Sequence, residues 1–404
     1  MVCLLLDSVK KSSRSVHRTF GGAPAPSLPG VTDPSSPRSG PVWRVGRAEH
    51  HPDRHELRVA IDGEDVVVRA PGHRLADVPE AWATLLAIPA ARTGATVELP
   101  AAVDPRWLAG AQENVAQAAG WWGGDDVLGL QTPPPTIWPR TQRFLGLGPN
   151  PARGRALCFT GGVDSFFSLL AGDHRPTHLL FVHGYDLPLD DVDRRAAASQ
   201  AIQAVAEARG LVPLEVETNL RHHHCFAQAS WEHTHGAALV CIALLLRGEL
   251  GALVIPPSYA TSRLIPWGSH PELDERWSLP GVLAVEHGDA GPFRRERLRA
   301  VATDPLVHAH LRVCWAHLQP GVNCGRCEKC VRTMIDLEYL GQLDAVATFP
   351  HDRDLPELID AMTVLPASIV PMWRDLGNLP IRPEVVAAIE RLLARTDASL
   401  VTPG

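Results

Sequence analysis

The sequence predicts an α/β protein with a doubly wound parallel sheet, preceded by a small α+β region and followed by a four-cysteine cluster. Short apolar runs alternate with helical segments from residue 155 to residue 259. A strand–helix–strand succession of this kind implies parallel strands joined by right-handed crossovers. The 404 residues, of which 45% are hydrophobic and 21% charged, are enough for one large core or for two domains.

The bulk composition excludes several classes of protein. A formal net charge of −7 argues against bulk electrostatic binding to nucleic acid. No apolar run approaches the roughly 18 residues that span a bilayer, so no membrane association is expected. The opening MVCLLLDSVKK has too short an apolar run for a signal peptide, and its lysines follow that run. These observations predict a cytoplasmic protein.

The first 150 residues divide into a leader and a small domain. Residues 1–41 are rich in proline, glycine and serine, which predicts a flexible leader. Residues 42–150 are expected to form a small α+β domain that ends in a proline-rich linker. Its elements are a hairpin, a helix, a strand and a second helix at residues 55–70, 75–94, 95–100 and 104–122. Asp104 is a good N-cap for the second helix, with Pro105 at its first position.

The main domain is expected at residues 151–345. Its predicted strands are residues 155–160, 177–184, 211–218 and 252–259, and its predicted helices are residues 164–172, 191–210 and 235–251. The remainder, residues 346–404, reads as a helical extension, most clearly at 383–395, and carries no recognisable chemistry.

A glycine turn, TGGVDS at residues 160–165, joins the first of these strands to its helix. Two glycines permit a tight turn whose amides approach an anion, and a helix start adds free amides and a positive dipole end. Thr160 and Ser165 add hydroxyl donors, and Asp164 is expected to hold magnesium or cap the helix. The turn is neither a Walker A loop nor a dinucleotide-binding turn. A plain glycine turn is the alternative, but the strand–helix context favours a phosphate loop.

The stretch FTGGVDS resembles the S-G-G-x-D-S pyrophosphate loop of the N-type ATP pyrophosphatases, in the adenine nucleotide alpha-hydrolase superfamily. Thr160 stands where that family has serine, and it keeps the hydroxyl. The resemblance implies a HUP-like sheet, ATP and Mg²⁺ as ligands, and a substrate adenylate that a nucleophile resolves with loss of AMP. The expected ATP-binding residues are Thr160, Gly161, Gly162, Val163, Asp164 and Ser165, with His183 and Asp186 at the adenosine pocket.

Four cysteines are concentrated in a short stretch as Cys314-x9-Cys324-x2-Cys327-x2-Cys330. Two C-x-x-C steps that share a residue suit a tetrahedral four-thiolate zinc site, with Gly325 relieving the turn. An iron–sulfur cluster is the competing occupant. A site closed by four cysteines is structural, because it has no vacant position for chemistry.

Together, the loop and the cysteines resemble the 7-cyano-7-deazaguanine synthase group, whose zinc site has a first gap one residue shorter. The resemblance covers roughly residues 155–335. It implies that a carboxylate or carbonyl acceptor is adenylated and then attacked by a nitrogen nucleophile. Cys3 is not the N-terminal residue that a glutaminase of the asparagine-synthetase type needs, so the nitrogen would come from ammonia, an amine or a partner.

A long polar and aromatic segment, residues 258–278, follows the fourth predicted strand and is expected to face the same crevice. We expect it to bind the acceptor, although a solvated excursion is the plain alternative. The candidate substrate-binding residues are Arg221, Arg263, His270, Asp274 and Arg276. The expected catalytic residues are Asp164, Ser165 and Arg263, with an arginine neutralising the acceptor's carboxylate.

Three consecutive histidines and Cys225 follow Arg221. A second metal site is the less favoured interpretation, because adjacent histidines point in different directions on any regular element. Cys225 as a sulfur carrier would instead indicate sulfur transfer to the acceptor. Two more alternatives stay open. In the first alternative, the acceptor is a protein or peptide that the N-terminal domain docks. In the second, the protein senses a nucleotide and catalyses no reaction.

Overall fold

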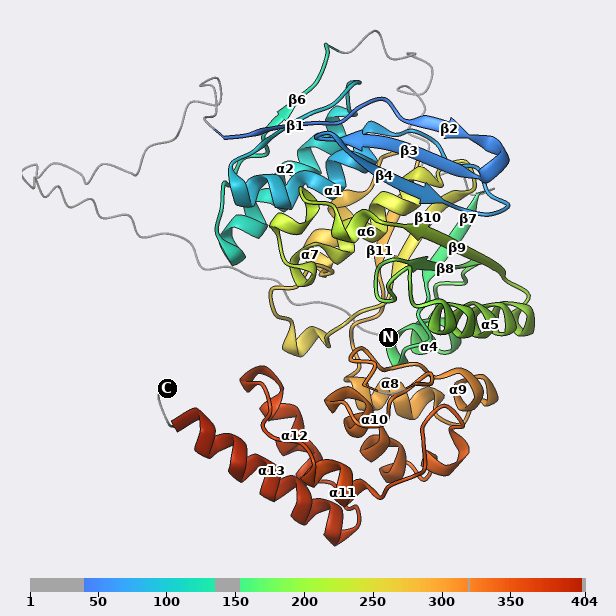
Figure 1. The fold of residues 1–404 in the computed structure, drawn as a ribbon, viewed down its shortest axis with the longest axis vertical. Coiled ribbons are helices and arrows are strands. Elements are labelled where there is room, and N and C mark those ends of the chain that lie inside the picture. Colours follow the sequence, from blue (N-terminus) through green and yellow to red (C-terminus); the bar gives the residue numbers. More distant parts are fainter. Residues whose placement is uncertain (1–39, 135–152, 319, 402–404) are drawn as a thin grey trace, which may run out of the picture. The chain divides into compact units, whose positions relative to one another are not determined.

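An eight-stranded sheet runs through the part of the chain that the structure, a computed structural model, describes: residues 40–134, 153–318 and 320–401 (Figure 1). These residues belong to one compact unit. The expected leader, residues 1–41, lies outside the described residues except for Gly40 and Pro41, and most of the expected linker does too.

Five parallel strands form the larger part of this sheet, and the alternating sequence pattern predicts the first four of them. They are β7 (Gly154–Cys158), β8 (His178–His183), β9 (Val212–Thr218), β10 (Leu250–Ile255) and β11 (Ala284–His287). Their order in space is β11-β10-β7-β8-β9. The chain forms the central strand β7 first, adds β8 and β9 on one side of it, and then adds β10 and β11 on the other side. The strand order therefore reverses between β7 and β10, where open α/β sheets bind ligands.

Three antiparallel strands extend the sheet beyond β9. They are β4 (Glu64–Arg69), β3 (Glu56–Ile61) and β2 (Glu49–His51), and β4 pairs with β9. The Asn219 side chain reinforces this junction, donating to Asp65 O and accepting from Val67 N, both at 2.9 Å. The sequence predicts the hairpin but not its partner. Because the hairpin completes the main sheet, the expected boundary near residue 150 does not separate two sheets.

A second, small parallel sheet lies wholly in the N-terminal region. Its strands are β1 (Val42–Arg44), β5 (Thr96–Glu98) and β6 (Leu130–Gln131). Of these, the sequence indicates only β5.

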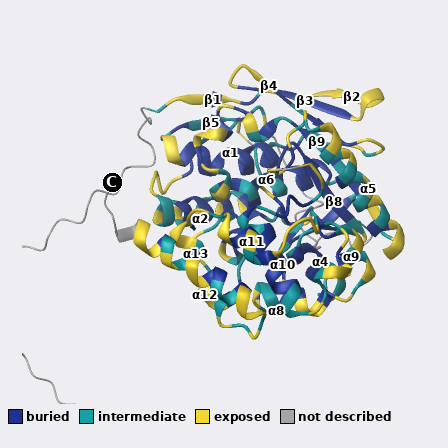
Figure 2. Cartoon of the chain, turned by 60° about the horizontal axis from the view of Figure 1, so that its bottom comes forward, coloured by how far each residue is buried: buried dark blue, intermediate teal, exposed yellow. Residues whose placement is uncertain are grey.

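Helices cover both faces of the large sheet and bury its central strands, whereas the edge strand β2 is largely exposed (Figure 2). One face packs against α1 (Pro79–Thr93), α2 (Pro105–Trp122) and α6 (Trp231–Leu245). The other packs against α4 (Val163–Leu170) and α5 (Val192–Arg209). Neighbouring strand residues alternate between these cores, Leu180 toward the first and Leu179 and Phe181 toward the second. That alternation is the period-2 pattern of a β-strand.

Six α-helices of 6 to 19 residues follow β11 in the described part of the chain and build onto the α4 and α5 face. They are α8 (Arg294–Val301), α9 (Pro305–His310), α10 (Glu328–Tyr339), α11 (Leu355–Asp360), α12 (Val370–Gly377) and α13 (Pro383–Val401). The expected helical extension thus shares the core of that face, with Trp373 fully buried. None of the described helices has the length and apolarity that crossing a membrane requires.

Candidate functional site

The glycine turn lies at the carboxyl end of β7, the central strand where the strand order reverses. Gly161 has φ +73°, and a Cβ there would lie 3.1 Å from His310 O. Its own carbonyl accepts from Arg312 N at 2.7 Å. Gly162 is the N-cap of α4, and Ser165 Oγ donates to Gly162 O at 3.0 Å. The turn therefore has the backbone that its glycines predict, and it presents the free first amides of a helix.

Asp164 is held by two arginines of α8. Arg294 donates to one carboxylate oxygen at 2.9 Å and Arg297 to the other at 2.8 Å. Arg297 is fully buried and also donates to Pro257 O and Tyr259 O. A magnesium ion on Asp164 would have to compete with both guanidinium groups. The expected magnesium ligand thus fixes α8 against the loop.

Basic side chains that the sequence reasoning missed surround the loop. One Nη of Arg294 is buried without a hydrogen-bond partner. Lys329 lies among Asp164, Asp186 and Arg294, and burial followed by the charge of Arg294 lowers its pKa. Burial also lowers the pKa of Arg312, which donates to Thr160 O at 3.0 Å. The charged form of such a cation becomes more stable when a multivalent anion lies beside it.

The sequence carries a signal for Arg294 alone among these three residues. The run PFRRERLR begins a few residues after the fifth parallel strand, so its arginines begin a helix at the same edge of the sheet as the glycine turn. That strand, β11, has only four residues and was not predicted.

A pocket of about 730 Å³ opens beside the loop. Its walls are Thr160 and Gly161, residues between 191 and 204 at the start of α5, and residues between 309 and 322. Ala198, Ala201 and Ile202 give one apolar wall, while His310 and Arg312 add nitrogen groups on the other. The volume falls in the range of small-molecule sites.

The two residues expected at the adenosine pocket lie in different places in the structure. Asp186 is exposed and close enough to Lys329 and Arg312 to act on their pKa values. His183 instead binds Glu215 at 2.8 Å and lines a different pocket of about 490 Å³ between α5 and β9. His183 ends β8 with its ring directed toward β9, so it does not meet the loop's pocket.

Three of the expected acceptor-binding residues hold the fold together. Asp274 is fully buried, where Ser269 Oγ donates to it at 2.8 Å and His287 Nδ1 lies 2.7 Å away. His270 caps the short helix α7 (Pro271–Asp274). Arg276 pairs with Glu113 of α2 at 3.2 Å. This part of the segment packs onto α2, a contact that residue spacing does not reveal, and none of these three side chains lines the pocket beside the loop.

The other two arginines are also engaged. Arg263 pairs with Asp375 of α12 at 3.1 Å and lies over the ring of Phe293. About half of its side chain is exposed, so this pair is weak and leaves it free to rearrange. Arg221 donates to Tyr185 O and lies 4.5 Å from the centre of the Trp231 ring. Within the described part of the chain, neither arginine forms a hydrogen bond or ion pair with the glycine turn.

The four clustered cysteines, here called the cysteine knuckle, come together as their spacing predicts. All four are buried, and their sulfur atoms lie within 4.8 Å of one another. Cys324 and Cys330 are 3.9 Å apart at sulfur. Zinc–sulfur bonds of about 2.3 Å in a tetrahedron place sulfurs about 3.8 Å apart. Hydrogen bonds from Cys327 and Cys330 lower the pKa of Cys314, which favours the ligating thiolate. The knuckle can therefore hold a metal ion such as zinc.

Two neighbours fix the knuckle's shape. Gly325 has φ +65°, and a Cβ there would lie 2.5 Å from Pro350 Cγ. The buried Asn323 accepts from Val313 N at 2.8 Å and Cys314 N at 3.1 Å, while its own amide donates to Leu311 O. Asn323 thereby ties the first cysteine to the other three. Arg312, which contacts the loop, lies on the same tied segment.

No protein-family model matches the chain, and no curated protein or solved structure matches it either. The function therefore has to be inferred from the site itself.

Proposed function

We propose that the protein is an ATP-dependent enzyme that adenylates an acceptor with release of pyrophosphate, as N-type ATP pyrophosphatases do, on a HUP-like fold. One observation carries the proposal. The turn TGGVDS lies at the carboxyl end of the central parallel strand, beside the reversal of strand order, and is surrounded by Arg294, Arg312 and Lys329. Glycine amides and partly buried cations at that place suit a polyphosphate.

The loop and its cations would bind the β- and γ-phosphates. The free amides of Gly162 and Val163 point along the start of α4, and the unpartnered nitrogen of Arg294 is available to an oxygen. Asp164 acts through Arg294, which it holds in place. Lys329 has a lowered pKa, and its charged form gains from an adjacent phosphate.

The adenosine would occupy the 730 Å³ pocket beside Thr160 and Gly161. Its alanine-rich wall on α5 allows close approach of a flat base, and Arg312 lies between the base and the phosphates. Asp186, at the same edge, is a free carboxylate that can contact a ribose hydroxyl.

In the first step an acceptor oxygen attacks the α-phosphorus. The bond from that phosphorus to the bridging oxygen breaks, and pyrophosphate leaves with the electron pair, its charge balanced by Arg294, Arg312 and Lys329. In the second step a nitrogen nucleophile, ammonia or an amine, attacks the activated carbon, loses a proton and displaces AMP.

Magnesium, when bound with ATP, supplies further neutralisation of the triphosphate. Both oxygens of Asp164 are taken up by arginines, so the structure does not favour Asp164 as its ligand. Zinc in the cysteine knuckle would be structural: it would hold α10, and with it Lys329, against the loop.

Sulfur transfer has less support than nitrogen transfer. All seven cysteines in the described part of the chain are buried, and burial raises the pKa of Cys225 to about 12. A sulfur carrier needs an accessible thiolate. A docking role for the N-terminal region stays a hypothesis, although its hairpin is an integral part of the main sheet.

Calorimetry with a non-hydrolysable ATP analogue and Mg²⁺ tests the proposal. Gly161→Ala should weaken binding roughly tenfold or more, because a side chain at φ +73° strains the loop by about 1–2 kcal/mol and crowds His310 O. Gly210→Ala is the matched control: Gly210 caps α5 at φ +63° with nothing within 4 Å of its missing Cβ. Equal binding by both variants, or no heat with the wild type, would overturn the assignment. Binding without AMP release from any acceptor would favour a nucleotide sensor.

A further inference from the structure

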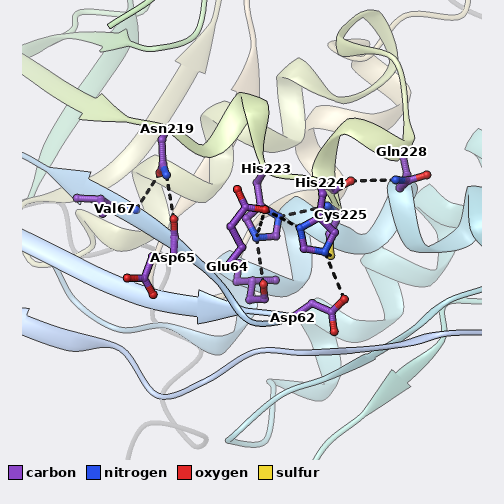
Figure 3. Close-up of polar contacts among 10 residues, drawn as sticks. Asp62, Glu64, Asp65, Val67, Asn219, His223, His224, Cys225 and Gln228 are labelled. Atoms are coloured by element: carbon purple, nitrogen blue, oxygen red, sulfur yellow. Dashed lines mark hydrogen bonds and ion pairs between the residues drawn. The ribbon is translucent and has the colours of Figure 1, made fainter.

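Four side chains meet at the tip of the β3–β4 hairpin (Figure 3). Asp62 lies in the hairpin's turn, Glu64 begins β4, and His224 and Cys225 come from the loop before α6. These four residues are here called the hairpin cluster. The two from the hairpin lie about 160 positions before the two from the loop. The proposed adenylation does not use them.

The hairpin cluster has the spacing of a metal-binding set around His224 Nε2. Cys225 Sγ lies 3.2 Å from this nitrogen, and Asp62 Oδ2 lies 3.3 Å from it. A tetrahedral zinc ion, with bonds of about 2.0–2.3 Å, would place sulfur about 3.6 Å and oxygen about 3.4 Å from a nitrogen ligand. The two distances from His224 Nε2 to its neighbours therefore lie within a few tenths of an ångström of those in a tetrahedral site.

The second nitrogen of His224 is also arranged as in metal sites. Nδ1 lies 2.6 Å from Glu64 Oε2. Histidines that bind a metal through one nitrogen nearly always donate from the other to a carboxylate or carbonyl, which fixes the ring and its tautomer. Glu64 thus orients the ligand and would not itself bind the ion.

The adjacent His223 has a different task. Its Nε2 lies 3.0 Å from Ile61 O, and its Nδ1 accepts from Cys225 N at 3.2 Å. Both nitrogens are used, the ring is buried, and the Cys225 backbone is fixed by it. His223 therefore acts as a positioning residue for the thiol.

We propose that Asp62, His224 and Cys225 bind a divalent first-row transition ion, zinc foremost, through one oxygen, one nitrogen and one sulfur. The thiol side of the site is closed, because Cys225 is completely buried. The opposite side is open, with Asp62 and His224 both more than a third exposed. The fourth position of the ion therefore faces solvent, where water or a small ligand completes the tetrahedron.

Cobalt titration of the full-length protein with a zinc-loaded knuckle tests the site. One equivalent of Co²⁺ should bind and give thiolate-to-cobalt charge-transfer absorption. Cys225→Ser should abolish that absorption and keep the knuckle's zinc. A band that persists in this variant would come from the knuckle and would overturn the proposal, as would its absence in the wild type.

A second variant guards against misfolding, since Cys225 is buried. Asp62 has φ 47°, a conformation that asparagine tolerates as well as aspartate. Asp62→Asn should weaken cobalt binding at least tenfold with an unchanged far-ultraviolet circular dichroism spectrum. Glu64→Gln should weaken it by about 10–100-fold, the usual effect of losing a ligand's carboxylate partner.

His222→Ala is the matched control. His222 is an exposed histidine in the same run, outside the cluster. The His222→Ala variant should bind cobalt with the same affinity as the wild type. Equal affinities for the wild type, Asp62→Asn and Glu64→Gln would show that these carboxylates form an ordinary hydrogen-bonded turn, and would sink the proposal. Because no nucleotide is present, the outcome is independent of the adenylation hypothesis.

Discussion

The cysteine knuckle and the hairpin cluster are two candidate metal sites built in opposite ways. The knuckle takes four buried sulfurs from residues 314–330, a single stretch of chain. The hairpin cluster combines one sulfur with nitrogen and oxygen from two distant segments, and two of its three proposed ligands are exposed. A closed four-thiolate set favours permanent, structural binding, whereas an open mixed set favours exchange. The spacing of ligands in the sequence therefore reveals a site whose ligands come from one stretch of chain. It does not reveal a site assembled from distant segments.

The largest effect is expected from Cys327→Ser. Removing a knuckle ligand forfeits metal binding that is worth about 10–16 kcal/mol in structural zinc sites, as much as a whole domain's stability. We expect insoluble or unfolded protein with less than one zinc per chain. Cys225→Ser should stay folded. Zinc content is measured by mass spectrometry of metals. Similar solubility and similar zinc content for the two variants would contradict the difference that we expect between the two sites.

A smaller loss of stability is expected from Gly325→Ala. The new methyl group would lie 2.5 Å from Pro350 Cγ and would occupy a backbone with φ +65°. We expect a loss of about 2–4 kcal/mol in denaturant unfolding, from strain and overpacking together.

Gly341→Ala is the control for this change, because it has φ +67° with nothing within 4 Å of the added carbon. It should lose only the backbone part, about 1–2 kcal/mol. Equal losses would mean that the contact with Pro350 does not constrain the knuckle.

Zinc in excess should raise the Tm of protein whose knuckle is already filled. A ligand at 100 times its Kd stabilises the folded state by about 2.7 kcal/mol, and the hairpin cluster is the second site that we propose for zinc in the described residues. Asp62→Asn should shift less at the same zinc concentration, and His222→Ala should shift as the wild type does. Identical shifts for all three proteins would remove the difference between the two sites.

The smallest change is expected in thiol reactivity at Cys225. In the folded protein with a filled knuckle, brief alkylation mapped by mass spectrometry should spare the four knuckle cysteines, because a bound metal would protect their thiolates. Cys225 should stay unlabelled, because it is fully buried and burial raises its pKa to about 12. Labelling of Cys225 in the folded protein would contradict the closed thiol side of the hairpin cluster.

Local features were predictable because their energies depend on a few adjacent residues. Asp104 caps α2 by accepting from Arg106 N at 2.8 Å, and Gly210 ends α5 with a positive φ. The glycine turn opens α4, and the four cysteines converge as their spacing requires. In each case a single hydrogen bond, dihedral angle or ligand reach decides the conformation.

Long-range features were not predictable in this way. Asp274 is charged and sits in a polar stretch, yet it is buried against Ser269 and His287 because its helix packs on α2. Asp164 meets two arginines from a helix 130 positions later. A run of three histidines indicates a metal only once the hairpin carries Asp62 and Glu64 to it.

By itself, the sequence determined the alternation of strands and helices, the bend at Gly161 and the thiol set of the knuckle. These follow from short-range sterics, periodic burial and ligand spacing. Only the tertiary structure decided that the N-terminal hairpin completes the main sheet, that partly buried cations surround the bend, and that carboxylates face His224. Those outcomes depend on strand pairing and helix docking between distant segments, whose energies no short stretch of chain contains.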